Sequence, residues 1–328
     1  MRVSNVYDSY WRFAAERQAI YLRRLAGSGG PWTHDPILQR HRFTNCYRAA
    51  DRVSQYLIGE VQYGEHRSDA PDELFFRTIL FKLFNRVATW QLLEQTLGTL
   101  SWQSADSNAI SAVLDRAIER RNRVYSAAYI MPSPNFGHAR KHRNHIALLW
   151  QMMANGLPAR VAATRSLKEV YALLRAQPGL GPFLAFQFAI DLNYSSLLDH
   201  SEADYVVAGP GALDGIAKCF ENVDGKSPEE VIHWVCERQD SEFAERGIEF
   251  AGLFGRPLQP IDCQNLFCEI SKYARVAHPH VAGLSGRTRI KQLFTEAARP
   301  LPQPSFPPRW QLTVPQHLGG RELAPMLL

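Results

Sequence analysis

The chain has 328 residues, 45% of them hydrophobic, which is enough for one large core or two modest lobes and excludes a wholly disordered protein. No apolar segment reaches the roughly 18 residues of a membrane span, and the N-terminus lacks the apolar core of a signal peptide. The 37 Lys and Arg residues exceed the 32 Asp and Glu residues, and this net charge of +5 mildly favours a polyanionic partner. We therefore expect a globular cytoplasmic protein with no membrane partner and no evident obligate protein partner.

Helical periodicity extends over most of the chain. Apolar residues at three- and four-residue spacing predict a first helix over Tyr7–Leu25, which the sequence GSGGP ends. A second helix is expected after Thr44, a suitable N-cap, and continues to Gln62. The segment from Asp72 to Val87 is apolar on most sides, which predicts a buried helix. Further helices are expected at 107–121, 142–155, 166–176, 182–193, 210–220, 227–238, 241–251 and 261–276.

Strand patterns are scarce, because the apolar run at Tyr205–Val207 is too short to build a sheet. The tail from Pro300 is rich in proline and is expected to form an extended arm or a disordered end. We therefore predict an all-α protein.

The cysteines give no indication of a metal centre. They are scattered and form no CxxC pair, which argues against a zinc site and an iron–sulfur cluster. The five positions are Cys46, Cys219, Cys236, Cys263 and Cys268. We expect reduced thiols, no bound metal and no cofactor.

Three short segments concentrate positive charge: RAIERRNR at 116–123, HARKHRNH at 138–145 and RTRIK at 287–291. Each could neutralise DNA phosphates, and binding would then depend on salt. In the second segment, Arg140, Lys141 and Arg143 are the candidates for phosphate contacts. The alternative is that these segments are ordinary solvated surfaces.

The most informative local pattern is a tight turn, PGLG at 178–181, between two expected helices. Gly179 and Gly181 permit backbone angles and close approaches that other residues do not, and Leu180 would anchor the turn in the core. Amide groups at the start of the following helix favour a bound anion. Pro178, Gly179, Leu180 and Gly181 are therefore predicted to clamp a DNA phosphate, although any helix–helix turn can use this sequence.

The turn resembles the hairpin of helix-hairpin-helix DNA glycosylases, in which the catalytic aspartate follows the hairpin proline by about two dozen residues. Asp204 lies 26 residues after Pro178, and Asp199 and Asp214 are its rivals. A carboxylate below the deoxyribose would stabilise the positive charge that develops as the N-glycosidic bond breaks. The alternative is that Asp204 only caps a helix.

A second resemblance covers most of the chain, about residues 7–276. The segment FTNCYRAADRVSQYLI (Phe43–Ile58) is similar to the helical domain of phage thymine-hypermodification enzymes. These are the α-glutamyl/putrescinyl thymine pyrophosphorylases and the hydroxymethyluracil DNA kinases. SAAYIMPS (126–133), VVAGPGALDGIAKCF (206–220) and IDCQNLFCEISKY (261–273) resemble the same family.

This resemblance implies an enzyme that acts on modified bases in double-stranded DNA, including phage DNA. It also implies a fold derived from helix-hairpin-helix glycosylases. We expect two helical lobes, at about 1–157 and 158–276, with the DNA cleft between them. Residues 277–328 would be a basic, proline-rich C-terminal extension.

Some proteins similar to this family are antiphage glycosylases that excise glucosylated 5-hydroxymethylcytosine and leave an abasic site. No GxxxxGK[ST] motif is present, so the chain is not expected to be the kinase itself. No lysine follows the hairpin, which argues against a strand-cleaving lyase. We therefore predict a monofunctional antiphage DNA glycosylase. The alternatives are a transferase or pyrophosphorylase of thymine hypermodification and a non-catalytic DNA-binding module.

Two polar groups on expected helices could hydrogen-bond a flipped pyrimidine or a sugar attached to it. The candidates are Asn45, Arg48 and Asp51 in the first group and Gln264, Asn265 and Lys272 in the second. The alternatives are a surface ion pair in the first group and an amphipathic outer helix face in the second.

Overall fold

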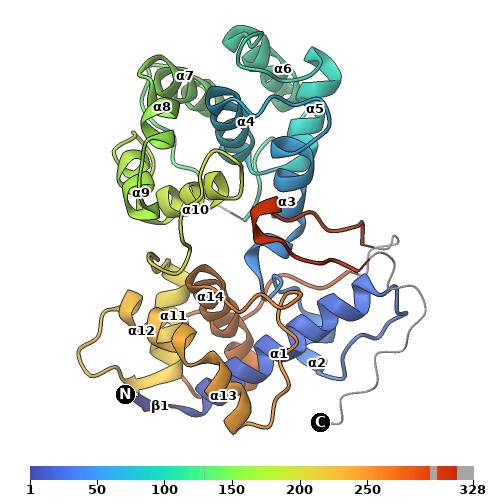
Figure 1. Cartoon of the computed structure of the whole chain (residues 1–328), viewed down its shortest axis with the longest axis vertical. Helices are drawn as coiled ribbons and strands as arrows, with labels where there is room; N and C mark the ends of the chain where they lie inside the picture. The colour runs from blue at the N-terminus through green and yellow to red at the C-terminus, as the bar shows by residue number, and fades with distance from the viewer. Residues whose placement is uncertain (129, 296–300, 316–328) are drawn as a thin grey trace. The chain divides into compact units, whose positions relative to one another are not determined.

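The computed structural model of the protein describes residues 1–128, 130–295 and 301–315 (Figure 1). In this part of the chain nearly all regular structure is helical, which confirms the predicted all-α class. Its two-stranded antiparallel sheet consists of β1 (Arg2–Val3) and β2 (Phe220–Asn222), with Val3 paired to Phe220. None of the described helices is long and apolar enough to cross a membrane.

The described residues divide into two compact units, each made of segments that are discontinuous in sequence. Unit 1 combines Met1–Asp51, Val206–Pro304 and the segment from Pro308, whereas unit 2 combines Arg52–Tyr205 with Ser305–Pro307. The glycosylase-like lobes at 1–157 and 158–276, with a DNA cleft between them, stay a prediction.

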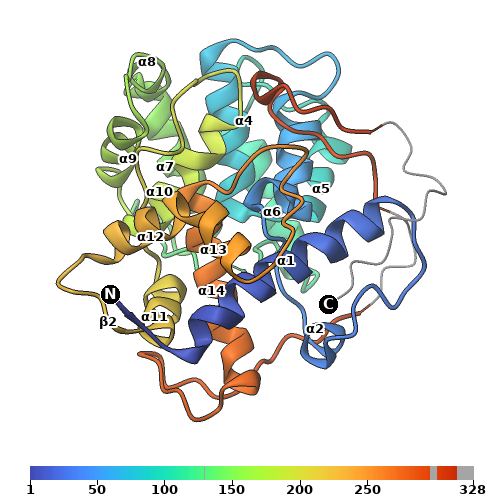
Figure 2. The same ribbon diagram turned by 60° about the horizontal axis from the view of Figure 1, so that its bottom comes forward.

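Unit 1 is built on α1 (Asn5–Leu25), α11 (Pro210–Cys219) and α14 (Pro260–Ala277). α11 and α14 lie side by side in both views (Figure 1 and Figure 2). Gly215 permits this close packing, because a Cβ atom there would lie 2.0 Å from the carbonyl oxygen of Phe267. α1 packs against both helices, and the Tyr10 ring lies 4.7 Å from the Phe267 ring. The other α-helices of unit 1 are α2 (Pro36–Arg40), α12 (Pro228–Glu237) and α13 (Gln239–Glu245).

Unit 2 is organised around α4 (Pro71–Phe84), which is buried on nearly all sides, as its apolar sequence predicts. The helix ends where Asn85 adopts a left-handed φ of 49°, so the segment predicted to continue to Val87 turns instead into α5 (Val87–Leu97). In the interior, Lys82 forms an ion pair with Asp191 at 3.0 Å. The remaining α-helices are α3 (Arg52–Tyr56), α6 (Ser107–Glu119), α7 (Lys141–Ala154), α8 (Leu157–Ala162), α9 (Leu167–Arg175) and α10 (Pro182–Asn193).

The predicted turn between two helices is present in unit 2. α9 ends just before it and α10 begins at Pro182, directly after Gly181. Gly179 has φ +80°, and Leu180 is buried, so it anchors the turn as expected. Phosphate binding by this turn stays a prediction.

Alanine substitutions should distinguish the two glycines of the turn. Gly179→Ala is expected to lower the free energy of unfolding by about 1 kcal/mol, because an L residue is strained at φ +80° and Pro134 lies 3.4 Å from the new Cβ position. Gly181→Ala should change it by less than about 0.5 kcal/mol, because its φ is −68° and the space beside it is open. Urea unfolding measures both values, and equal losses would contradict the left-handed geometry of Gly179.

The segment after Thr44 does not form the continuous helix that its periodicity predicts. It contains a 3-10 turn (Arg48–Ala50), then α3, then a π-helix (Leu57–Gln62). The prediction is therefore correct about helical character after residue 48 and wrong about the start of the helix.

Carboxylates explain this difference. The backbone N–H of Asn45 donates to Asp51 Oδ1 at 2.8 Å, and that of Arg48 donates to Asp262 Oδ1 at 2.9 Å. Because side chains bind these N–H groups, the residues do not enter a regular helix. Thr44 is not an N-cap, since its hydroxyl contacts Asn265 instead.

Two further predictions concern the segment at 241–251 and the tail from Pro300. The helix predicted at 241–251 ends at Glu245, because Gly247 adopts φ 62° and the N–H of Ile248 donates to the Phe243 carbonyl. In the C-terminal tail, Pro308–Trp310 forms one 3-10 turn, whereas residues 296–300 and 316–328 lie outside the described residues.

Candidate functional site

The two polar groups predicted from the sequence meet in unit 1, where Arg17 of α1 joins them. We call this assembly the Asn45 cluster. Its members are Arg17, Thr44, Asn45, Arg48, Asp51, Asp262, Asn265, Glu269 and Lys272. Thr44, Asn45 and Lys272 are partly exposed, whereas Asp262 and Glu269 are buried. The cluster therefore combines solvent-accessible polar side chains with buried carboxyl groups.

Hydrogen bonds attach residues 44 and 45 to α14. The N–H of Thr44 donates to Glu269 Oε2 at 3.0 Å. The side-chain amide of Asn265 donates to Thr44 Oγ1 at 3.2 Å and to the Asn45 carbonyl at 3.0 Å. Asn265, which the sequence suggests as a base-reading residue, thus also holds the neighbouring loop in place.

Arg17 belongs to this cluster although the sequence analysis does not single it out. Its side chain is 8% exposed, and it donates to the Thr44 carbonyl at 2.9 Å and to Asn45 Oδ1 at 2.8 Å. The amide nitrogen of Asn45 donates in turn to the Ala50 carbonyl at 2.7 Å. The sequence does contain a signal for Arg17, because an arginine on the core-facing side of a predicted helix needs a buried polar partner.

Burial raises the pKa of Asp51 to about 7 and that of Asp262 to about 6. Backbone N–H donors oppose this effect in both groups, and the Glu269 carboxylate adds to the raised pKa of Asp51. A carboxyl group with a pKa near 7 changes protonation at neutral pH. Asp51 is therefore the residue of the cluster best suited to exchange a proton with a substrate.

The raised pKa of Asp51 predicts a pH-dependent stability. Between about pH 4 and 7 the folded protein keeps a proton that the unfolded carboxyl group has lost, so stability falls as the pH rises through this range. Asp51→Asn retains an acceptor for the Asn45 N–H and removes the charge. At pH 8 the variant should be more stable than the wild type by about 1–3 kcal/mol, with little difference at pH 4.

Urea unfolding at pH 4, 6 and 8 measures this difference, with the exposed Asp240→Asn as the matched control. The control should follow the wild type at every pH. Parallel curves for Asp51→Asn and the wild type would show that Asp51 does not titrate in this range.

The other two predicted base-reading residues of α14 lie in different surroundings. Gln264 is buried, and its amide donates to Cys268 Sγ at 3.2 Å. Lys272 is partly exposed, forms an ion pair with Glu269 at 2.6 Å and lies 5.6 Å from the ring centre of Phe43. Lys272 can therefore meet a ligand directly, whereas Gln264 can do so only after a rearrangement.

The three candidate catalytic aspartates occupy distinct environments. Asp204 and Asp199 are exposed, and Asp204 lies in a bend before Tyr205. Asp214 is buried and accepts hydrogen bonds from Ser271 Oγ and from the N–H of Ser285. Burial alone would raise the pKa of Asp214, but these bonds outweigh it and keep the pKa below its ordinary value. Asp214 thus connects α11 to α14 and to the loop at 285, and the catalytic role of Asp204 stays a prediction.

The basic segment at 138–145 is partly neutralised within unit 2. Arg140 pairs with Asp115 at 2.6 Å and with Glu119 at 3.0 Å, and Arg143 pairs with Asp115 as well. Burial alone would raise the pKa of Asp115, but the arginine hydrogen bonds lower it to about 2. Lys141 is partly exposed. Phosphate contacts by these three basic residues stay predictions, and they would compete with the existing ion pairs.

The cysteines are free thiols in the structure. Burial raises the pKa of four of them, which disfavours the reactive thiolate. These four are Cys46, Cys219, Cys263 and Cys268. Over the ranges that the structure describes, no group of three or more His, Cys, Asp or Glu side chains could hold a metal ion.

The segment that matches a known family includes both the Asn45 cluster and the turn at 178–181. The family described as "5-hmdU DNA kinase, helical domain" matches residues 4–283. The chain belongs to this family. It is 25% identical over 289 residues to a 5-hmdU DNA kinase of Bacillus phage SP10, a match that covers 82% of this chain. The same match covers 45% of the phage protein, so the chain spans less than half the length of that relative. No solved structure matches.

Membership of the 5-hmdU DNA kinase helical family confirms the predicted kinship with modified-base DNA enzymes and corrects the predicted reaction. The prediction of a monofunctional hydrolytic glycosylase that excises glucosylated 5-hydroxymethylcytosine in antiphage defence is wrong. Both matches are described as kinases, and kinases are transferases. The prediction relied on a hairpin and on the distance from Pro178 to Asp204. Neither feature specifies whether a bond is hydrolysed or a group is transferred.

Proposed function

We propose that this chain is the helical domain of a transferase that acts on a 5-hydroxymethylated pyrimidine in DNA, with the Asn45 cluster as its base-recognition and proton-transfer site. The observation that carries the proposal is the family match over residues 4–283, which includes every member of the cluster. The phage relative is named a 5-hmdU DNA kinase. We therefore propose 5-hydroxymethyluracil in DNA as the first substrate to test and a phosphoryl group as the first transferred group to test.

The chemistry of such a transfer gives Asp51 a role. The hydroxymethyl oxygen attacks the γ-phosphorus of a nucleoside triphosphate and loses its proton, while the bond from that phosphorus to the leaving nucleoside diphosphate breaks. A carboxylate with a pKa near 7 can accept that proton at neutral pH. The sequence contains no GxxxxGK[ST] motif, so we propose that the phosphoryl donor binds without a P-loop.

The partly exposed polar groups of the cluster suit a flipped pyrimidine. Asn45 and Asn265 each carry an amide that can both donate and accept, and both side chains are partly exposed. Reading a base would require these amides to exchange some of their present partners. Lys272 provides the accessible positive charge for a nearby phosphate.

The hairpin is the proposed second contact with DNA. No side-chain hydrogen bond caps the start of α10, and the positive end of this helix's dipole favours a phosphate beside the turn. Arg175 donates to the Leu180 carbonyl at 3.3 Å and brings a positive charge to the same turn.

The test compares duplexes that differ at one base, 5-hydroxymethyluracil or thymine. Fluorescence anisotropy should give about tenfold tighter binding to the modified duplex. After incubation with ATP and Mg²⁺, mass spectrometry of the nucleosides should detect phosphorylated hydroxymethyldeoxyuridine. Asp51→Asn should retain binding and lose the product. Equal affinity for both duplexes would refute base recognition, and abasic sites would refute group transfer.

Lys272 allows a narrower prediction about DNA affinity. Lys272→Gln should weaken binding of either duplex by about three- to tenfold and reduce the salt dependence by about one phosphate contact. The control is Lys226→Gln, which removes an exposed lysine of the same unit. If both variants bind equally well, Lys272 does not contact the phosphate backbone.

A further inference from the structure

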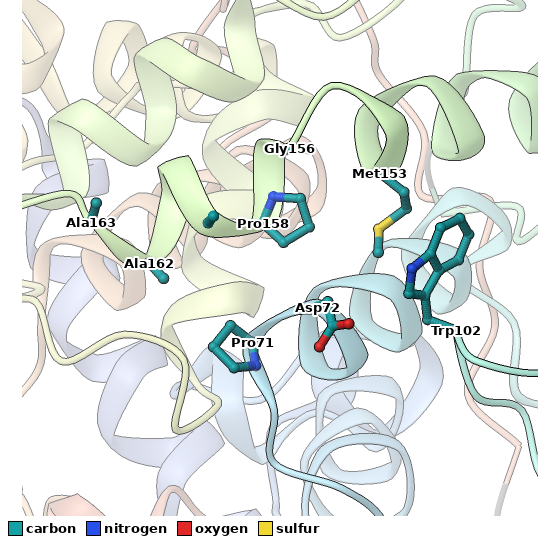
Figure 3. Close-up of a pocket in the computed structure, with 9 residues that line it drawn as sticks. Pro71, Asp72, Trp102, Met153, Gly156, Pro158, Ala162 and Ala163 are labelled. Carbon is teal, nitrogen blue, oxygen red and sulfur yellow. The ribbon is translucent and has the colours of Figure 1, made fainter.

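Unit 2 contains a surface pocket, largely open to solvent, with a volume of about 650 Å³; it is separate from the Asn45 cluster (Figure 3). We call it the cavity below. Its walls come from the start of α4, from Trp102 and from the end of α7 with α8. Pro71, Pro158 and Met153 provide apolar surface, and three alanines at 159, 162 and 163 leave the space open. A cavity of this size accommodates a small heterocycle or a nucleoside.

Two polar groups face this largely apolar space. Figure 3 shows the indole nitrogen of Trp102 and the carboxylate of Asp72 on the cavity side of their elements. Asp72 Oδ1 accepts the N–H of Glu73 at 3.0 Å, whereas Asp72 Oδ2 and the indole N–H of Trp102 have no hydrogen-bond partner among the described residues. The cavity therefore offers one free donor and one free acceptor, and Asp72 is its only charged lining residue.

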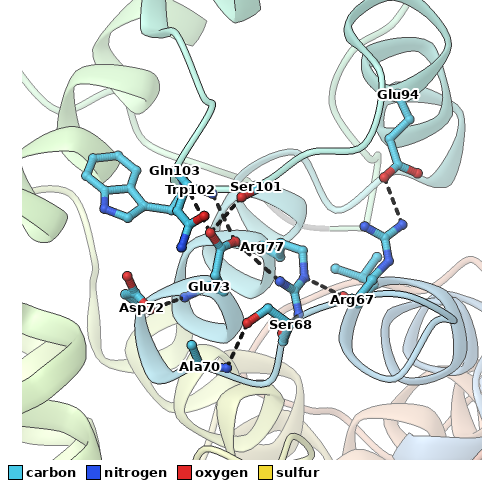
Figure 4. Close-up of polar contacts among 11 residues, drawn as sticks. Arg67, Ser68, Ala70, Asp72, Glu73, Arg77, Glu94, Ser101, Trp102 and Gln103 are labelled. Atoms are coloured by element: carbon cyan, nitrogen blue, oxygen red, sulfur yellow. Dashed lines mark hydrogen bonds and ion pairs between the residues drawn. The ribbon is translucent and has the colours of Figure 1, made fainter.

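A buried carboxylate holds Trp102 in position (Figure 4). Glu73 is 1% exposed and accepts from Ser101 Oγ at 2.7 Å, from the N–H of Trp102 at 2.9 Å and from the N–H of Gln103 at 3.2 Å. Arg77 donates to the same carboxylate at 3.4 Å. The loop that carries Trp102 is thus fixed before any ligand arrives, which lowers the entropy lost on binding.

We propose that this cavity binds a neutral cyclic amide, the N–H and C=O edge found in uracil and related free bases and nucleosides. The ring N–H would donate to Asp72 and the adjacent carbonyl would accept from the indole of Trp102. The indole N–H of Trp102 needs an acceptor, which an ammonium group lacks, so a group with an adjacent donor and acceptor matches both polar groups. The carboxylate of Asp72 disfavours a phosphate, so a nucleotide binds less well than the corresponding nucleoside.

The test uses the full ¹⁵N-labelled chain and the indole N–H resonance of Trp102, which Trp102→Phe assigns. Titration with uracil should move this resonance, because a new hydrogen bond deshields the proton. 1,3-Dimethyluracil lacks both ring N–H groups of uracil and should bind about tenfold more weakly. Uridine should bind more tightly than uridine 5′-monophosphate.

Matched variants test whether the two polar groups bind the ligand or only support the fold. Equilibrium dialysis measures the affinity of each variant for radiolabelled uracil. Asp72→Ala and Trp102→Phe should each reduce affinity by about tenfold. Asp69→Ala, an exposed residue of the preceding loop, should leave it unchanged. Circular dichroism confirms that each variant is folded. Equal binding of uracil and 1,3-dimethyluracil, unchanged affinity of Trp102→Phe, or no resonance shift at millimolar uracil would overturn the proposal.

Discussion

Replacing Gly215 with alanine is expected to lower the free energy of unfolding by about 3 kcal/mol or more. In an ordinary helix this change would stabilise the protein by about 1 kcal/mol, since alanine has the higher helix propensity. At Gly215 the new Cβ would lie 2.0 Å from the carbonyl oxygen of Phe267, which is backbone and cannot move alone. α11 and α14 would have to separate.

The effect should extend to the Asn45 cluster, because α14 carries Asp262, Asn265, Glu269 and Lys272. We therefore expect Gly215→Ala to weaken DNA binding as well as stability. The control is Gly211→Ala on the same helix, where the new Cβ would meet the sulfur of Cys268 at 2.9 Å, a side-chain atom that can rotate away. Its loss should be about 1 kcal/mol. Urea unfolding of both variants gives the comparison, and a stable Gly215→Ala would show that the two helices can move apart at little cost.

The second large effect is expected for Glu73→Ala in unit 2, at about 3–5 kcal/mol of unfolding free energy. The substitution leaves the buried guanidinium of Arg77 without its carboxylate and removes the acceptor of three further donors. Glu73→Gln preserves the shape but presents an NH₂ group to some of these donors, so an intermediate loss is expected.

The measurement is urea unfolding of Glu73→Ala, Glu73→Gln and the exposed control Glu65→Ala. Tryptophan fluorescence should also change in the first two variants, since the loop with Trp102 loses its anchor. If Glu73→Ala is as stable as Glu65→Ala, the four contacts to this carboxylate contribute nothing to folding.

The correction from hydrolysis to group transfer has a physical basis. A phosphate-binding turn and a carboxylate near a sugar or base serve any enzyme that must hold DNA and polarise a substrate. The reaction depends on which atom attacks and which group leaves, and these depend on side chains brought together by the fold. We propose Asp51, whose pKa is raised to about 7, as such a residue, and its local sequence resembles that of an ordinary surface ion pair with Arg48.

Local sequence determined the helical class, most helix positions, the turn at 178–181 and the family, because periodicity, glycine and proline positions and short motifs act over a few residues. The tertiary structure alone decided that residues 44–51 leave the helical path, since Asp262 on α14, more than two hundred positions away, accepts the N–H of Arg48. It also decided that Arg17 joins the Asn45 cluster and that Asp51 titrates near neutral pH. Burial and hydrogen bonding between distant segments set these properties, and no local pattern encodes the removal of a carboxyl group from water.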